Sequence, residues 1–387
     1  MKFDFGLDWK ELRRFDKLKD EERSIVFYAE NKASMNHFRL LIKSLTEEKN
    51  LQICYITSVK NDPMLSIKNK NILSFYIGNG TARTKFFIFL KAKILIMDMP
   101  NLDTFHIKRS KVYPVHYVYI FHSVFSVHSY LKKGAVDNYD TIFCVGKHHE
   151  NEIREIESKF GLKEKKLIKY GFGRLDTLID EKKNLIKNSS DDNLIIITPT
   201  YGENNLLKIC GVKLIEILLE SNYKVLIRPH FRIFEESKEV IDEIKSKFGK
   251  NSNFILEDGV IPSEKFHGSR CLISDWSGIS FEYAFTFEKP VIFIDVPKKV
   301  LNSDSNYISL EPIEVTNRNK IGYIINPNDL NKIIQVIKDI DEDESKKEEI
   351  RKIRSDLIYN LGNSAEIGTN FLQKLLDDLN QKNIEEI

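Results

Sequence analysis

The sequence predicts an α/β protein with two lobes, each built on a parallel sheet. Short apolar, β-branched runs alternate with helical patterns along most of the chain, which is typical of βαβ units with strands buried on both faces. A polar, turn-rich stretch interrupts the series at residues 179–193. The length of 387 residues also exceeds what one ordinary core accommodates, so two domains are expected.

The first lobe is expected to span residues 1–178. A charged lead-in covers the first 23 residues, and a helix is expected at residues 34–48 because its apolar positions share one stripe. A second helical pattern covers residues 86–90. Strands are expected at residues 24–30, 51–57, 72–77, 94–97, 115–121 and 141–145.

The second lobe is expected at residues 194–345, where the alternation restarts after the linker at residues 179–193. Residues 346–387 should form C-terminal helices, because their apolar positions recur with a helical period. Helices are expected at residues 204–220, 234–248, 329–340, 346–360 and 364–380. Strands are expected at residues 194–198, 224–227, 253–256, 271–273 and 290–295.

The composition is that of a soluble globular protein, with 42% apolar and 30% charged residues. A net charge of +2 excludes a strongly basic nucleic-acid binder, although a local basic patch is compatible with it. The four cysteines contain no C-x-x-C pair and indicate free thiols in a reducing compartment. They are Cys54, Cys144, Cys210 and Cys271.

The sequence indicates neither a secretion signal nor a membrane span. Residues 1–8 are charged and lack the apolar core of a signal peptide. No window reaches the roughly 18 uninterrupted apolar residues that a membrane span needs. We therefore expect a cytoplasmic protein, and a peripheral contact with the cytoplasmic face of the membrane stays open.

The second lobe carries the strongest sign of a ligand, a predicted site for a phosphate-bearing molecule. Polar residues at the carboxyl ends of parallel strands lie where open α/β sheets bind ligands. Arg228 and His230 follow one strand and are suited to contact a diphosphate. Their alternative role is a structural salt bridge. A second strand leads into the segment that begins at Ser274, and Ser277-Gly278 then opens a helix whose first N–H groups attract anions.

Within this segment, hydroxyls and backbone N–H groups predict a phosphate cradle. Ser277 or Asp275 also caps the helix in either interpretation. Glu282, one turn further, is placed to bond ribose hydroxyls unless it faces solvent. The residues assigned to the cradle are Ser274, Asp275, Ser277 and Gly278.

In the first lobe, His122 is the candidate general base. It directly follows an apolar strand, and an imidazole at that strand end can accept a proton from an attacking hydroxyl. A packed, hydrogen-bonded histidine fits the same pattern. His128 is a weaker candidate, and His148-His149 lack the i, i+4 spacing of helical zinc ligands.

A glycine pair, Gly78-x-Gly80, lies between a predicted strand and a predicted helix, as in a dinucleotide fingerprint. Position 83 is arginine, where the fingerprint requires a third glycine for close helix–strand packing. We interpret the segment as a tight loop and expect no nicotinamide cofactor.

Several motifs, in this order, resemble the CDP-glycerol glycerophosphotransferase family, which includes teichoic-acid and related capsule polymerases. The most specific are Arg228-Pro-His230 and the run from Ser274-Asp-Trp-Ser-Gly to Lys289-Pro-Val-Ile-Phe. The other pieces are Phe121-His-Ser with Leu131-Lys-Lys-Gly, Gly171-Phe-Gly-Arg-Leu-Asp, Ile197-Thr-Pro-Thr-Tyr and the C-terminal Gly362-Asn-Ser-Ala.

The resemblance implies a GT-B fold, with two Rossmann-like domains facing each other across a cleft. The C-terminal lobe would hold a CDP-alditol, and the N-terminal lobe would hold an anionic or lipid-linked glycan acceptor at the inner membrane face. The enzyme would transfer glycerol phosphate or ribitol phosphate to an acceptor hydroxyl and release CMP, with no cofactor and no tightly held metal.

Carried over residue by residue, the resemblance makes His122 the general base and His230 the group that stabilises the diphosphate. Thr200, Arg228, Ser274, Asp275, Ser277, Gly278 and Glu282 would line the donor site. A locally basic acceptor side suits a polyanionic polymer, and the candidates for it are Lys132, Lys133 and Arg174.

Three alternative functions stay open. A GT-B glycosyltransferase would move a sugar from a nucleotide donor, within capsule, lipooligosaccharide or other surface-glycan synthesis, using the same cradle. A sugar-nucleotide epimerase would need a set of paired acids that the sequence does not clearly supply. A non-catalytic nucleotide- or carbohydrate-binding protein would bind donor without needing His122.

Overall fold

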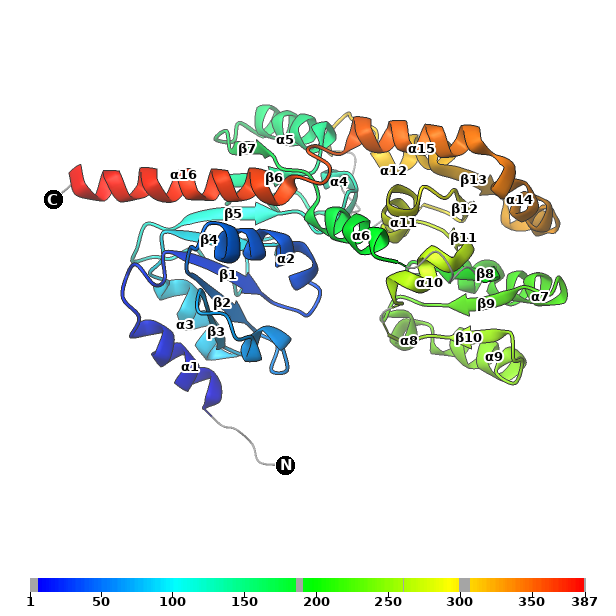
Figure 1. Ribbon diagram of the computed structural model, residues 1–387, viewed down its shortest axis with the longest axis horizontal. Coiled ribbons are helices and arrows are strands. Elements are labelled where there is room, and N and C mark those ends of the chain that lie inside the picture. Colours follow the sequence, from blue (N-terminus) through cyan, green and yellow to red (C-terminus); the bar gives the residue numbers. More distant parts are fainter. Residues whose placement is uncertain (1–5, 186–190, 260, 299–306, 386–387) are drawn as a thin grey trace. The chain divides into compact units, whose positions relative to one another are not determined.

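The computed structural model describes residues 6–185, 191–259, 261–298 and 307–385 (Figure 1). Residues 1–5 of the charged lead-in and residues 186–190 of the predicted linker lie outside the described residues. The chain forms two compact units. Unit 1 contains Met1–Asp176, Asn306–Ile308 and Ile358–Ile387, and unit 2 contains Thr177–Ser305 and Ser309–Leu357.

Unit 1 is built on a seven-stranded sheet in the order β3-β2-β1-β4-β5-β6-β7, with every neighbouring pair parallel. The six predicted strands are confirmed. The seventh, β7, was missed because it is an edge strand whose lysines at both ends are exposed, so it lacks an apolar run. The strands are β1 (Ile25–Ala29), β2 (Ile53–Thr57), β3 (Ile72–Tyr76), β4 (Ile94–Met97), β5 (His116–Ile120), β6 (Thr141–Cys144) and β7 (Lys166–Lys169).

Helices cover both faces of this sheet, which explains why its strands are apolar throughout. On one face, Phe38 and Leu41 of α2 and Leu372 of α16 pack in one core against the strands. On the other, Phe15 of α1 meets Phe75 of β3 and Phe86 of α3 edge-on. The helices are α1 (Leu7–Asp16), α2 (Met35–Lys43), α3 (Thr81–Phe89), α4 (Val127–Tyr130), α5 (Lys147–Phe160) and α16 (Ser364–Glu385), with short π and 3-10 turns at Ser44–Glu48 and Pro63–Ser66.

Unit 2 repeats the plan with a six-stranded parallel sheet in the order β10-β9-β8-β11-β12-β13. The five predicted strands are present, and the edge strand β13 was missed because it is short and begins with Gly322, whose added Cβ would meet the Val291 carbonyl. The strands are β8 (Asp191–Thr198), β9 (Lys224–Ile227), β10 (Phe254–Leu256), β11 (Ser269–Ser274), β12 (Val291–Ile294) and β13 (Gly322–Ile325).

The core of unit 2 joins the strands to α7, α9 and α14 on one face, through side chains such as Leu214, Ile244 and Ile333. The longer helices are α7 (Val212–Glu220), α9 (Lys238–Phe248), α11 (Ile279–Phe287), α14 (Ile333–Asp339) and α15 (Glu344–Leu357). The short elements are a π turn at Leu207–Gly211, α8 (Ile233–Glu236), α10 (Ser263–Gly268), α12 (Ile313–Thr316), α13 (Arg318–Ile321) and 3-10 turns at Pro327–Lys332 and Ile340–Glu342.

Helix α6 (Gly173–Lys183) contains the point where the chain passes from unit 1 to unit 2. The predicted linker, residues 179–193, is therefore helical at its start, and its last residues belong to β8. Polar residues that suggested a linker are anchored: Lys182 Nζ donates to the Thr286 carbonyl at 3.0 Å, and Ser263 Oγ donates to Glu181 at 2.6 Å.

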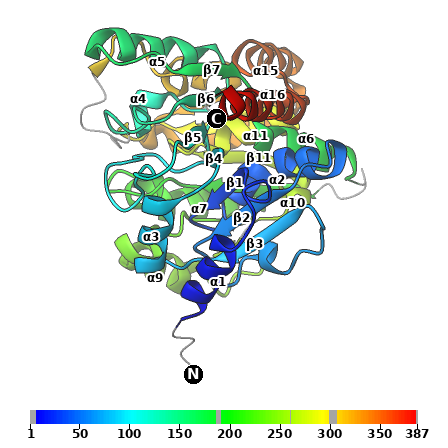
Figure 2. The same cartoon turned by 90° about the vertical axis from the view of Figure 1, so that its left-hand side faces the viewer.

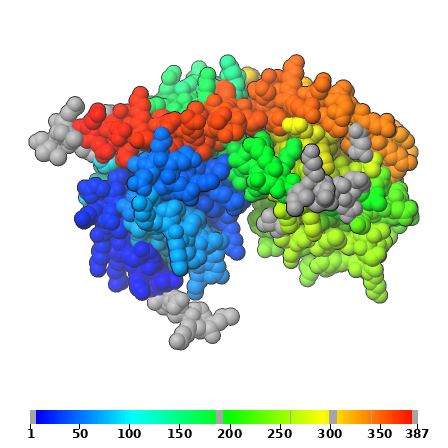
Figure 3. Space-filling view, in the orientation of Figure 1, coloured from blue at the N-terminus to red at the C-terminus, as the bar shows by residue number. Residues whose placement is uncertain are grey.

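The predicted C-terminal helices belong to different units. Helix α15 lies in unit 2, whereas α16 lies in unit 1. The outer side of α16 (red) forms part of the molecular surface in the space-filling view (Figure 3). Among the described residues, no helix is long and apolar enough to cross a membrane.

Candidate active site

The centre of the unit 2 sheet is a topological switch point, because the chain runs outward from β8 through β9 to β10 and then returns to β11 on the other side of β8. Ligands of open α/β sheets bind outside the carboxyl ends of strands at such a point. Thr200 follows β8, and the segment from Asp275 to Gly278 follows β11. The sheet therefore brings these predicted donor-site segments together.

Asp275 organises the loop after β8. Its carboxylate, almost fully buried, accepts hydrogen bonds from the Thr200 N–H at 2.8 Å and the Leu206 N–H at 3.1 Å. Ser274, also buried, donates from its Oγ to the Thr198 carbonyl at 2.7 Å. These polar groups hold two strand ends together, and the assignment of Ser274 and Asp275 to the donor site stays a prediction.

The turn into α11 is the more accessible part of the predicted cradle. Ser277, Gly278 and Glu282 are each half-buried. The Ser277 carbonyl accepts from the Ser280 N–H at 3.1 Å and from Ser280 Oγ at 2.6 Å, which fixes the turn at the start of the helix. The first N–H groups of α11 consequently lie at the carboxyl edge of the sheet, where they can attract an anion.

Arg318 packs against Trp276 in this turn and was missed by the sequence analysis. Its side chain is only 4% exposed, and its guanidinium lies 3.9 Å from the Trp276 ring centroid and 3.1 Å from Asp295 Oδ1. Trp276 Nε1 donates to the Val296 carbonyl at 3.0 Å. The Trp276 side chain is thus held by the Arg318 guanidinium and by its hydrogen bond to the Val296 carbonyl. A lone arginine in a short polar helix gave no sequence signal for this role.

His230, which follows β9, lies between two tilted aromatic rings. Its ring centroid lies 4.5 Å from those of Tyr201 and Phe231, and Arg232 covers the Tyr201 ring at 4.3 Å. His230 Nδ1 accepts the Arg232 N–H at 3.3 Å, so the neutral imidazole carries its proton on Nε2 and presents it as a donor. Arg228 is half-buried, and its Nε donates to the Gly259 carbonyl at 3.2 Å.

In unit 1, His122 lies at the carboxyl end of β5. Burial lowers its pKa, and a hydrogen bond with the backbone of Asp98 acts in the opposite direction. A hydrogen bond that raises a histidine pKa uses a protonated ring nitrogen as donor. The other ring nitrogen of neutral His122 therefore keeps a lone pair that can accept a proton. Its ring meets Tyr130 edge-on at 5.4 Å.

Three buried groups that the sequence analysis missed surround His122. Asp98 follows β4, and its Oδ1 accepts a hydrogen bond from Ser34 Oγ at 3.0 Å. Burial raises the pKa of Asp98 to about 7. His37, 6.2 Å from the His122 ring, has its pKa lowered to about 3 by burial. Asp98 could have been found, because it is a polar residue at the end of an apolar strand, as His122 is.

The other predicted histidines are structural. His148 and His149 of α5 bond the Val124 and Phe125 carbonyls at 2.9 Å each and hold the loop that follows His122. His128 lies 3.4 Å from the buried Glu152 carboxylate. In the described part of the chain, no group of three or more His, Cys, Asp or Glu side chains is placed to hold a metal ion.

The predicted acceptor-side residues differ in their surroundings. Lys132 and Lys133 are exposed, and Lys133 Nζ lies 3.6 Å from the Phe160 ring centroid. Arg174, half-buried in the first turn of α6, is close enough to His37 to lower its pKa. Arg174 is therefore the member of this set that lies near the His122 region.

The Gly78-x-Gly80 segment is a tight loop, in line with our interpretation. Gly78 has a φ of +60°, which favours glycine, and its carbonyl accepts from Ser58 Oγ at 2.8 Å. Arg83, at the third position of the fingerprint, is buried and pairs with Glu30 at 2.9 Å.

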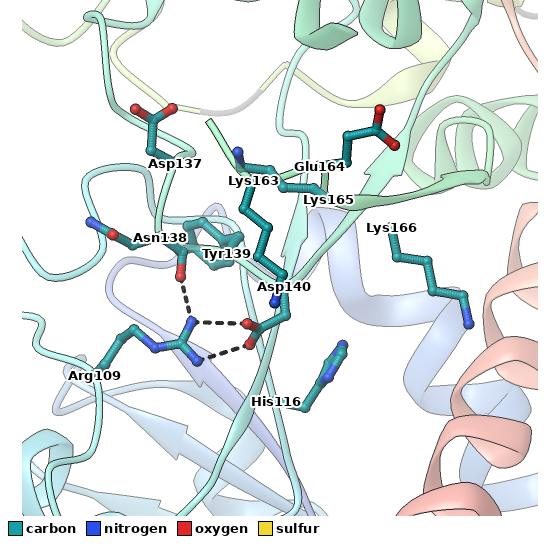
Figure 4. Close-up of a pocket in the computed structure, with 10 residues that line it drawn as sticks. All are labelled: Arg109, His116, Asp137, Asn138, Tyr139, Asp140, Lys163, Glu164, Lys165 and Lys166. Carbon is teal, nitrogen blue, oxygen red and sulfur yellow. Dashed lines mark hydrogen bonds and ion pairs between the residues drawn. The ribbon is translucent and has the colours of Figure 1, made fainter. Parts of the chain in front are cut away.

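A pocket of about 490 Å³ lies at the amino-terminal ends of β5, β6 and β7 (Figure 4). It contains none of the predicted site residues. Two of its lining residues, Arg109 and Asp140, are joined by hydrogen bonds of 3.2 and 3.0 Å. Its ten lining residues carry both signs of charge and are Arg109, His116, Asp137, Asn138, Tyr139, Asp140, Lys163, Glu164, Lys165 and Lys166.

Solved structures with the same fold place the chain among proteins of the GT-B type. A structure of the wall teichoic acid polymerase TagF soaked with CDPG aligns at a TM-score of 0.59 and 15% identity, over 97% of this chain and 94% of that one. A Staphylococcus aureus MnaA–UDP structure aligns at 0.58 and 15%, over 92% and 97%. The Neisseria meningitidis UDP-GlcNAc 2-epimerase bound to UDP-GlcNAc gives 0.57 and 15%, over 90% and 99%.

The family of the chain is established by a match between its sequence and a family model. Residues 12–366 match the model of CDP-glycerol:poly(glycerophosphate) glycerophosphotransferases, and the chain belongs to this family. It is a transferase that moves a polyol phosphate from a CDP-linked donor to a surface polymer. This confirms the predicted family, GT-B-type fold and reaction class. No curated protein sequence matches the chain.

Proposed function

We propose that His122 removes the proton from the acceptor hydroxyl in this transfer. The hydroxyl oxygen attacks the phosphorus that carries the polyol, the bond from that phosphorus to the CMP oxygen breaks, and His122 takes the proton. The observation that carries this assignment is the place of His122 at the carboxyl end of β5, 6.2 Å from the His37 ring and next to Asp98.

The donor is assigned to the carboxyl edge of unit 2. His230, with its proton on Nε2, and Arg228 would neutralise the diphosphate and the leaving CMP. The start of α11 at Ser277 and Gly278 would receive a phosphate, with Glu282 at the ribose hydroxyls. Asp275, Ser274 and Thr200 keep this edge in shape. The proposal requires one bound substrate pair to reach both His122 and His230.

The acceptor is proposed to be an anionic, lipid-linked polymer at the cytoplasmic face of the membrane. Arg174 would contact it near His122, and Lys132 and Lys133 would add positive charge further out. The resemblance to polymer-building enzymes and the basic residues support this assignment.

The test is CMP release from CDP-glycerol, CDP-ribitol and UDP-linked sugars, each with and without a polyol-phosphate acceptor. Wild-type protein should release CMP from a CDP-alditol only when acceptor is present. His122→Asn should lower kcat by about 10²–10⁴-fold, the usual contribution of a general base, while donor affinity stays within about twofold. Turnover of UDP-sugars alone, or an unchanged kcat for His122→Asn, would contradict the proposal.

A further inference from the structure

Two neighbouring segments of unit 1 carry basic residues without any acidic ones. Residues 81–93 contain four Lys or Arg and residues 104–116 contain three, and neither contains Asp or Glu. The whole chain, by contrast, has 59 basic and 57 acidic residues. These two segments are therefore a local exception to a nearly neutral protein.

The segments lie side by side in the fold. The Lys111 N–H donates to the Ile88 carbonyl of α3 at 3.0 Å, and Lys91 Nζ lies 5.5 Å from the Tyr113 ring centroid. Figure 2 shows the cyan connection between β4 and β5 next to α3. The end of α3 and residues 111–113 therefore lie together at the amino-terminal ends of β4 and β5.

This surface also exposes large apolar side chains. Among the described residues, ten large apolar side chains are exposed, and four of them lie in these two short segments. They are Phe105 (69% exposed), Phe89 (54%), Val112 (52%) and Tyr113 (38%). We call these four side chains, with Lys108 and Lys111, the docking surface.

Part of the basic charge is compensated and part is not. Arg83, Lys85, Lys91 and Arg109 pair with Glu30, Asp16, Asp20 and Asp140 respectively. Lys93 bonds the Asn380 side chain, and Lys108 bonds the Asp103 and Thr104 carbonyls at 2.9 and 3.2 Å. Within the described residues, Lys108 and Lys111 have no carboxylate at ion-pair distance, so the surface keeps an excess of positive charge.

The loop that carries the exposed side chains is fixed in place. Arg109 bonds both oxygens of Asp140 and the Asn138 carbonyl, as Figure 4 shows, and its guanidinium lies 4.4 Å from the Tyr117 ring centroid. The Ser110 N–H donates to the Tyr117 hydroxyl at 2.6 Å. The backbone at residues 109–111 is therefore fixed against the sheet and α3.

We propose that the docking surface binds an anionic lipid bilayer. Aromatic side chains settle at the level of lipid headgroups, and lysines beside them are attracted to anionic lipids. A nucleic acid would not need the apolar part, and a second copy of the chain would bring positive charge against positive charge. The purpose of the contact rests on the proposed lipid-linked acceptor, but the contact itself does not depend on the transfer chemistry.

The experiment is flotation of the whole protein with phosphatidylcholine vesicles, with and without phosphatidylglycerol and in the absence of substrate. The protein should float with the anionic vesicles and should detach as salt is added. Phe105→Ser with Tyr113→Ser should weaken binding about tenfold or more, because two apolar side chains no longer enter the interface. Lys108→Gln with Lys111→Gln should weaken it about fivefold per lysine.

Matched controls lie in unit 2, where Ile255 is 41% exposed and Lys245 is exposed on α9. Ile255→Ser with Lys245→Gln should leave vesicle binding unchanged, and all variants should keep the wild-type unfolding midpoint and CMP release with a water-soluble acceptor. Equal binding to both kinds of vesicle, wild-type binding by both surface variants, or a shift in oligomeric state instead of flotation would overturn the proposal. Loss of the transferase assignment would leave the flotation result unaffected, so the two can fail separately.

Discussion

Burial acts in opposite directions on two neighbouring groups, the His122 imidazole and the Asp98 carboxyl. Removing water disfavours the charged form of each, so the pKa of His122 falls and that of Asp98 rises to about 7. Burial therefore favours the neutral form of both groups. This makes His122 available as a base at a pH where an exposed histidine would already be protonated.

The first prediction concerns the pH profile of the transfer. Only neutral His122 can accept a proton, and it is neutral above its pKa, which lies below the ordinary 6.5. We expect kcat/KM to fall on the acidic side with a midpoint below pH 6.5. His106→Asn, at an exposed histidine, should leave that limb in place. An acidic limb centred above pH 6.5, measured as initial rates of CMP release, would contradict the assignment.

The second prediction concerns stability at Asp98. Its pKa of about 7 in the native protein exceeds the ordinary 3.8, so the native state keeps a proton that the unfolded chain releases between about pH 4 and 7. Stability is therefore lost as pH rises through this window. Asp98→Asn removes the buried charge and should unfold at higher urea than wild type at pH 8, with little difference at pH 4. The same gain at both values would show that titration is not the cause.

At the scale of elements, the sequence predicted the interior strands and the strand-end residues well, because buried strands need apolar runs and parallel strands end at one edge. It failed at the edge strands, because β7 has only two apolar residues between exposed lysines and β13 is four residues long and begins with a glycine. It also could not show which hydrogen bonds the strand-end residues make within the fold. Asp275 looked like a ligand-binding carboxylate, yet both of its oxygens accept backbone N–H groups of a loop far away in sequence.

The third prediction follows from this support role. Asp275→Asn replaces one acceptor oxygen by an amide that cannot accept, so either Thr200 or Leu206 loses its buried partner. We expect a loss of about 1–3 kcal/mol in the free energy of unfolding and a weaker affinity for CDP-glycerol. Asp242→Asn, at an exposed position on α9, is the control. Donor affinity can be measured by calorimetry, and unchanged stability with lost affinity would instead indicate direct contact with the donor.

The Gly171-to-Asp176 motif gains a structural explanation at the same scale. Buried Asp176 accepts hydrogen bonds from the Gly362 N–H at 2.7 Å, the Ser364 N–H at 3.1 Å and Ser364 Oγ, and so caps α16. Gly171 has a φ of +103°, and an added Cβ would lie 2.3 Å from the Tyr359 carbonyl. The motif that ends at Asp176 and the motif that begins at Gly362 are thus hydrogen-bonded to each other.

The fourth prediction compares two aspartates of α6. Asp176→Ala leaves three donors unpaired and should cost about 3 kcal/mol of stability. Asp180→Ala removes only an exposed pair with Lys183, which is worth about 0–1 kcal/mol. Urea unfolding of the two variants measures the difference, and similar midpoints would mean that the cap contributes little.

For the whole molecule, the chain leaves unit 1 after Asp176, rejoins it briefly at Asn306–Ile308 and returns to it finally at Ile358, so both segments of unit 2 are inserted within unit 1. The docking surface lies at the amino-terminal end of β5, whereas His122 follows its carboxyl end. Five strand residues separate them by about 17 Å. An enzyme bound to a bilayer through this surface would therefore favour acceptors whose reacting hydroxyl stands well away from the lipid.

The fifth prediction uses the two tryptophans, Trp9 in unit 1 and Trp276 in unit 2. Leu372 of α16 is fully buried in the unit 1 core, so Leu372→Ala should cost about 2–5 kcal/mol there. In single-tryptophan variants, the Trp9 signal should shift to lower urea while the Trp276 signal moves less. Equal shifts would mean that the units unfold as one cooperative body.

The return of the chain to unit 1 also sets an order of assembly during translation. The inserted unit, ending at Leu357, leaves the ribosome complete before α16 has been made. Until then the strands of unit 1 lack the helix that contributes Leu372 and Leu375 to their core. The lobe synthesised first is consequently the lobe finished last, and its uncovered apolar face is the part of the nascent chain that a chaperone would have to shield.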